Sequence, residues 1–183
     1  SMGAVTQEFE SKFAEYVGVK HALAVANCTA ALHLASLAVG LRRGDRVICP
    51  SLTFVAAANA IRYAGAVPVF ADIQSTEDLN ISPDDVERKI DASTKAISVV
   101  HYGGHPCDMD AILPIARKHN LAVIEDAAHA VGAFLHGPDS VRRCGTMGDL
   151  GCFSFFANKN LVTGEGGMII TNRDDLAESI RSL

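Results

Sequence analysis

Two side chains in this sequence have the type and position that carbonyl chemistry requires. Lys159 follows the aromatic run Ser154-Phe155-Phe156 and precedes the glycine-rich turn Gly164-Glu165-Gly166-Gly167, and Asp126 ends the apolar run Val123-Ile124-Glu125. Taken singly, each has an ordinary explanation, because most lysines are surface residues and an aspartate after a strand often caps a helix or binds a metal ion. Together they indicate a reactive amine and a fixed carboxylate in one site.

This pair matches the needs of pyridoxal phosphate. An amine bonds to a carbonyl cofactor while it is neutral, a state that partial burial near positive charge favours. The pyridine ring is an electron sink while its nitrogen stays protonated, which a neighbouring carboxylate ensures. Asp126 is placed to supply that carboxylate, since ligands of open α/β sheets lie beyond the carboxyl ends of strands. Glu125 is the competing acid, but strand alternation points it to the opposite face.

Further motifs follow one another in a fixed order along nearly all 183 residues. They are Phe9-Glu10 to Gly18 with the strand after it, residues 27–32, 50–56, 68–72 and 101–108, the strand end at 125–129, and the lysine motif. With this set the chain resembles the DegT/DnrJ/EryC1/StrS family of pyridoxal-phosphate-dependent aminotransferases, which make amino sugars. The resemblance implies that pyridoxal 5'-phosphate is covalently bound to Lys159, with pyridoxamine phosphate as intermediate. It also implies that Asp126 pairs with the pyridinium and that Ser154 binds the phosphate.

Other cofactor contacts also follow from the resemblance. The apolar run 29–40 closes with a glycine and predicts a helix with Thr29 at or near its N-cap. Its free amides and dipole attract anions, so Thr29 and Ala30 are expected to bind the phosphate, with an ordinary cap as the alternative for Thr29. Family chains often have glycine in place of Cys28. Phe54 resembles the aromatic that stacks on the cofactor ring, whereas an aromatic in such an apolar run is otherwise a core residue.

The histidines have less specific interpretations. Relatives carry glutamine or histidine at the position of His129, where either side chain contacts the cofactor ring or its substituents; a structural histidine is the alternative. His101 and His105 flank two glycines, but no Cys or His pair completes a metal site, so no metal is expected. A loop after the strand at 96–100 explains them more simply.

The predicted reaction is transamination. A related sugar dehydratase carries histidine in place of the lysine, and here Lys159 is present. The expected donor is an amino acid, L-glutamate by analogy, and the expected acceptor is a nucleotide-linked keto sugar. The motifs around His101 and Asp126 favour a UDP-4-keto sugar. Alternatives are a 3-keto sugar, a keto-cyclitol, or a non-catalytic regulator or scaffold on the same fold. A dinucleotide-binding turn is excluded because residues 27–32 contain no glycine.

Composition sets broader limits. The chain has 183 residues, of which 49% are hydrophobic, and a net charge of −5, which suits one α/β core and argues against general nucleic-acid binding. Five cysteines without a disulfide framework indicate reduced thiols and a cytoplasmic location. No apolar stretch resembles a membrane span or a signal peptide, so no membrane partner is expected.

The predicted strands alternate with helices. Strands are expected near residues 21–26, 46–49, 67–71, 96–100, 122–126, 151–156 and 168–171, and helices near 5–17, 30–39, 54–64, 83–90, 108–119 and 173–182. This order predicts a three-layer α/β/α sandwich with a mainly parallel, about seven-stranded sheet, the large domain of fold type I pyridoxal-phosphate transferases. The connection 156–168 leaves no room for a crossover helix, so one strand there should run antiparallel.

The expected domain organisation is incomplete relative to the family. Residues 3–183 are interpreted as the cofactor-binding large domain, without the family's N-terminal segment and smaller C-terminal domain, and residues 1–2 as a tag remnant. The family implies a homodimer with composite sites. Catalysis is therefore expected of the complete protein rather than of this fragment.

Overall fold

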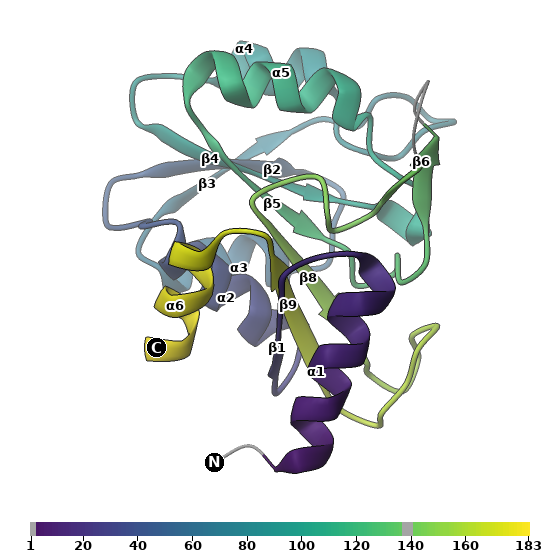
Figure 1. Ribbon diagram of the computed structural model, residues 1–183. Coiled ribbons are helices and arrows are strands. Elements are labelled where there is room, and N and C mark those ends of the chain that lie inside the picture. The colour runs from purple at the N-terminus through teal and green to yellow at the C-terminus, as the bar shows by residue number, and fades with distance from the viewer. Residues whose placement is uncertain (1–2, 137–140) are drawn as a thin grey trace.

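The protein is described by a computed structural model that covers residues 3–136 and 141–183; the expected tag remnant at 1–2 lies outside the described residues. At its centre is a seven-stranded sheet in the order β1-β9-β8-β5-β4-β2-β3 (Figure 1). Its strands are β1 (His21–Val25), β2 (Arg46–Pro50), β3 (Val67–Ala71), β4 (Thr94–Val100), β5 (Ala122–Asp126), β8 (Leu150–Ser154) and β9 (Gly167–Thr171). The predicted mainly parallel sheet is confirmed, and each predicted strand lies within two residues of its expected bounds.

Strand β9 runs against both of its neighbours. It pairs antiparallel with β1 and β8, whereas the other pairs in this sheet are parallel. Strand β8 ends at Ser154 and β9 begins at Gly167, and the segment between them holds no crossover helix. The predicted antiparallel strand is confirmed. The short connection keeps Lys159 close to the carboxyl end of β8.

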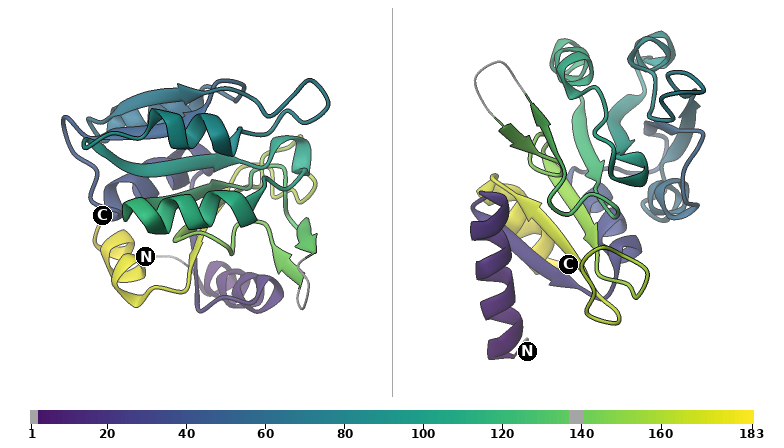
Figure 2. Two further views of the ribbon diagram at one scale, coloured as in Figure 1. Left: turned by 90° about the horizontal axis from the view of Figure 1, so that it is seen from above. Right: turned by 90° about the vertical axis from the view of Figure 1, so that its right-hand side faces the viewer.

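Helices cover both faces of the sheet and complete the predicted three-layer sandwich (Figure 2). One face packs against α2 (Cys28–Ala38), α3 (Ala56–Tyr63) and α6 (Asp174–Ser182), and the other against α1 (Ala4–Val17), α4 (Pro83–Lys89) and α5 (Met109–His119). Neighbouring strand residues serve different cores, as when Leu23 packs on the α2 side and Ala22 on the α1 side. This burial on both faces explains why the strands are continuous apolar runs.

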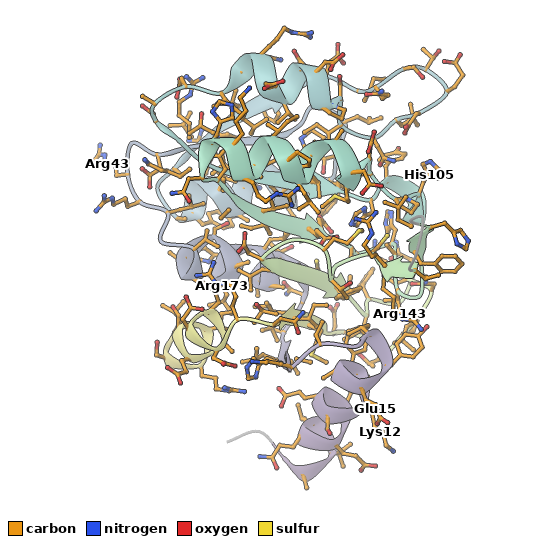
Figure 3. All side chains as sticks on the ribbon, turned by 45° about the horizontal axis from the view of Figure 1, so that its top comes forward. Lys12, Glu15, Arg43, His105, Arg143 and Arg173 are labelled. Atoms are coloured by element: carbon orange, nitrogen blue, oxygen red, sulfur yellow. The ribbon has the colours of Figure 1, made fainter. Side chains whose placement is uncertain are left out.

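A small hairpin was not predicted. Strands β6 (Phe134–His136) and β7 (Val141–Arg143) form an antiparallel pair outside the main sheet. The Arg143 guanidinium lies 4.8 Å from the centroid of the Tyr16 ring, and Figure 3 shows Arg143 beside α1. Each strand has three residues, which is too few for an alternating pattern to be recognised.

Candidate active site

A cavity of about 490 Å³ opens beyond the carboxyl ends of β4, β5 and β8. This is the edge at which open α/β sheets bind ligands. The cavity is lined by Asn27, Cys28, Thr29, Leu32, Thr53, Phe54, Ala56, Val100, His101, Tyr102, Asp126, Ala128, His129, Ser154, Phe156, Asn158, Lys159 and Glu165. The structure thus brings together every predicted site residue except Ala30, which is not among the lining residues.

The N-terminus of α2 forms one wall of the cavity. Asn27 is the N-cap, and its side-chain oxygen accepts a hydrogen bond of 2.9 Å from the Ala30 amide. The helix therefore begins at Cys28, two residues before the expected start, and Thr29 lies in its first turn rather than at the cap. The Ala30 amide already donates to the Asn27 side chain. An anion at this helix end could therefore bind the Thr29 hydroxyl and the amides before Ala30.

Asp126 is a buried acid in the cavity wall. It is 6% exposed, and its Oδ1 accepts a hydrogen bond of 3.0 Å from the Ala128 amide. The Cys28 thiol, a weak donor, lies 3.9 Å from the same oxygen. Burial raises the pKa of Asp126, and the Ala128 hydrogen bond opposes this rise only in part. Since no salt bridge to Asp126 occurs among the described residues, a cation bound in the cavity would favour the ionised carboxylate.

Glu125 faces away from this cavity, as strand alternation predicted. It is fully buried, with Oε2 2.8 Å from His101 Nε2, and its carboxylate accepts hydrogen bonds from the backbone amides of Gly145, Met147 and Gly148. His101 Nδ1 accepts from the Cys107 amide, so the proton sits on Nε2, which donates to Glu125. This pair fastens the loops after β4 and β7 beside Asp126.

Sequence reasoning missed the role of His101. His101 does lie in the loop after β4, as predicted, but the prediction did not include the full burial of its side chain or its pairing with Glu125. A buried glutamate needs donors, so Glu125 on an otherwise apolar strand was the signal that a partner must exist. The sequence contains seven histidines, and nothing local to His101 marks it as that partner.

Lys159 and His129 meet across the cavity. The Lys159 Nζ lies 2.6 Å from His129 Nε2. The lysine loop is held in place by a hydrogen bond of 2.9 Å from the Lys159 amide to the Phe156 carbonyl. Asn160 Nδ2 donates to the Val131 carbonyl at 2.8 Å, which ties the lysine loop to the segment that carries His129. Burial lowers the pKa of His129, and the charge of Lys159 lowers it further.

Phe54 and Ser154 occupy opposite environments in the cavity. The Phe54 side chain is 74% exposed, so the alternative of a core aromatic is excluded. Ser154 is buried at the end of β8, and its Oγ accepts a hydrogen bond of 3.4 Å from the Phe156 amide. An exposed aromatic ring and a buried hydroxyl therefore face the same space, one able to stack and one able to bind a polar group.

Residues 3–136 and 141–183 contain no group of three or more His, Cys, Asp or Glu side chains arranged to hold a metal ion. Within the same residues, no helix combines the length and the apolar character that crossing a bilayer requires.

Comparison with known proteins finds relatives of one family. The model of the DegT/DnrJ/EryC1/StrS aminotransferase family matches residues 1–183. The chain is 52% identical to a GDP-perosamine synthase of Caulobacter vibrioides over 183 residues, which are 100% of this chain and 48% of that protein. It is 51% identical to a GDP-perosamine synthase of Escherichia coli O157:H7, covering 94% of this chain and 46% of that protein.

A solved structure of S. venezuelae DesV in complex with a ketimine intermediate superimposes with a TM-score of 0.93 at 39% identity, covering 100% of this chain and 48% of that one. The chain spans about half the length of the curated relatives it matches. The family match nevertheless extends over the whole chain, strands, helices and cavity alike. The chain belongs to the DegT/DnrJ/EryC1/StrS aminotransferase family.

Proposed function

We propose that the complete protein is a pyridoxal-phosphate-dependent aminotransferase that moves an amino group from an amino acid, L-glutamate by family analogy, to a nucleotide-linked keto sugar. Residues 3–183 form its cofactor-binding large domain in this proposal. The observation that carries it is the convergence of Lys159, Asp126 and the N-terminus of α2 on one cavity. These are a nucleophilic amine, a buried carboxylate and an anion-binding helix end, which pyridoxal phosphate requires together.

The cavity residues fit this cofactor by their chemistry. The N-terminus of α2, with the Thr29 hydroxyl, would hold the phosphate together with Ser154. Ala30 takes part only if its amide leaves Asn27. Asp126 would hold the pyridine nitrogen in its protonated form, and this cation would relieve the cost of a buried carboxylate. Phe54 would stack on the ring, and His129 would contact the ring or its substituents.

Lys159 carries the proton transfers in this proposal. When bound, pyridoxal phosphate supplies the electron sink for the carbon that loses or gains the amino group. Once the amino donor has replaced it on the cofactor, Lys159 Nζ would move the proton at that carbon as acid and base. The buried Asp126 carboxylate would keep its negative charge next to the ring nitrogen throughout.

The acceptor is proposed to be a GDP-linked keto sugar. The motifs favoured a UDP-linked 4-keto sugar, and the relatives favour GDP instead, because two proteins 52% and 51% identical to this chain are GDP-perosamine synthases.

We expect the complete protein, given isotope-labelled glutamate, to aminate a GDP-linked keto sugar about 10-fold or more faster than the UDP-linked sugar. A few contacts to the nucleotide base are enough for a difference of this size. Mass spectrometry of the nucleotide sugar checks this. Preference for the UDP sugar would overturn the choice of nucleotide, and no labelled product from either would overturn the proposed reaction.

The functional unit is proposed to be a homodimer with the active site at or near its interface. Of the described residues that line the cavity, Lys159 is the only lysine or arginine, so the phosphate lacks a balancing cation. Three exposed apolar side chains, those of Leu52, Phe54 and Val55, lie close together in sequence at or next to the cavity. Such a surface is typical of one that a partner covers. A second copy would cover it and supply the missing cation.

This proposal predicts that cofactor affinity depends on protein concentration, because a site shared by two chains links cofactor binding to association. The complete protein should sediment as a dimer and lose cofactor when diluted below its association range. A monomer that keeps tightly bound cofactor and full turnover at nanomolar concentration would contradict the shared site.

A reducing compartment suits the cysteines. All five are free and buried, so none depends on oxidation for the fold. This supports the cytoplasm as the proposed location.

A further inference from the structure

The contact between Lys159 and His129 suggests a second role for the histidine. The inference rests on the proposed function, in which Lys159 bonds to a carbonyl cofactor. A lysine ammonium has no lone pair for that bond, so its proton must first leave. His129 Nε2 lies 2.6 Å from Lys159 Nζ, which is within hydrogen-bond distance and shorter than most N···N contacts.

We propose that His129 is the catalytic base that makes Lys159 nucleophilic. In this step the proton moves from Lys159 Nζ to His129 Nε2, the Nζ–H bond breaks, and its electron pair stays on nitrogen. The imidazole becomes an imidazolium, and the total charge of the pair does not change. The neutral amine could then bond to the carbonyl carbon of the cofactor, and the carbonyl oxygen would leave as water with one proton from the Lys159 nitrogen and one returned by His129.

The local structure places the two nitrogens for this transfer. The lysine loop and the segment after β5 are linked by the Asn160 side chain, which donates to the Val131 carbonyl at 2.8 Å. This hydrogen bond joins the residue next to Lys159 to a residue two positions after His129, so it holds the two segments together close to both side chains. Among the described residues, Lys159 is the hydrogen-bonding partner of the His129 ring.

The surrounding charges also suit a proton acceptor. Burial and the positive charge of Lys159 lower the pKa of His129, which keeps Nε2 free to accept, while the negative charge of Asp126 acts in the opposite direction. The negative charge of Asp126 attracts the single positive charge of the pair both before the transfer, on Lys159, and after it, on His129. The other titratable groups that line the cavity are Cys28, His101, Tyr102 and Glu165.

The test follows bond formation rather than turnover. Pyridoxal phosphate is mixed with the cofactor-free complete protein in a stopped-flow absorbance experiment, and the rate of bond formation is recorded against pH. His129→Gln keeps a hydrogen-bond acceptor but accepts no proton, so the rate near neutral pH should fall about 10²-fold. The deficit should shrink as pH rises, because hydroxide then removes the lysine proton.

Two further variants distinguish a proton-accepting role of His129 from a purely structural one. His129→Ala should be slow in the same way, and added imidazole should restore its rate in proportion to imidazole concentration. His105→Gln is the matched control, since His105 is exposed, lies at the surface in Figure 3 and does not line the cavity. It should bond at the parent rate.

The outcomes also distinguish this inference from the proposed function. Equal rates for His129→Gln and the parent protein at every pH would overturn the role of His129. A slow rate that neither imidazole nor rising pH restores would overturn it as well, because the contact would then be structural. If the parent protein forms no borohydride-reducible bond at Lys159, the proposed function itself fails.

Discussion

Lys159→Ala is expected to abolish the borohydride-reducible bond between the protein and pyridoxal phosphate. The Lys159 Nζ is the only lysine amine among the described residues that line the cavity, so no neighbouring lysine can replace it. Transamination should fall with it by several orders of magnitude, because both the covalent attachment and the acid–base group are lost. Peptide mass spectrometry after borohydride reduction of the complete protein locates the bond.

Lys12→Ala provides the control for this experiment. Lys12 lies on α1, and its ammonium forms an exposed ion pair of 2.7 Å with Glu8 (Figure 3). Its loss should leave the labelling at Lys159 unchanged. Labelling of a different lysine in the parent protein, or full labelling of Lys159→Ala, would show that the reactive amine lies elsewhere.

Asp126→Asn is expected to slow the half-reaction with the amino donor by orders of magnitude. The amide is nearly the same shape as the carboxylate, so the substitution removes charge rather than volume. Without that charge the ring nitrogen loses its proton and the cofactor becomes a poor electron sink, an electrostatic loss of the kind that costs about 10²-fold or more. Single-turnover kinetics of the complete protein measure it, with the exposed Asp84→Asn as control.

The stability of the cofactor-free variant shows whether a slow rate reflects misfolding. The folded-state pKa of Asp126 is raised by burial, so the native state loses stability as pH rises from the ordinary aspartate range toward the raised pKa. Asp126→Asn removes this penalty and should be at least as stable as the parent at neutral pH. The difference should vanish in acid, where both side chains are uncharged. Near-normal single-turnover rates in a folded variant would remove Asp126 from its role.

The fold was predictable because its strands are buried on both faces and its helices have clear ends. The short connection between Ser154 and Gly167 even fixed which strand pair runs antiparallel. The β6–β7 pair was not predicted, because strands of three residues are too short to show an alternating sequence pattern. The start of α2 was misplaced because both Asn27 and Thr29 are good capping residues, and only the bond from Ala30 to Asn27 decides between them.

The gathering of the candidate residues around one cavity was predictable where motifs carry chemistry, but the contacts between distant loops were not. Lys159 and Asp126 stand out by type and by position at strand ends. The contact of His129 with Lys159, and that of Glu125 with His101, join residues 30 and 24 positions apart. Such contacts depend on how loops distant in sequence pack against one another, which the local sequence pattern does not encode.

The visible absorbance spectrum of the complete protein with pyridoxal phosphate, recorded before and after addition of L-glutamate, tests the central claim most directly. We predict a band of lysine-bound cofactor that forms with the parent protein, is absent from Lys159→Ala, and is lost when glutamate is added without an acceptor. A parent protein that forms no such band, or whose band glutamate leaves unchanged, would contradict a cofactor-dependent aminotransferase site in this cavity.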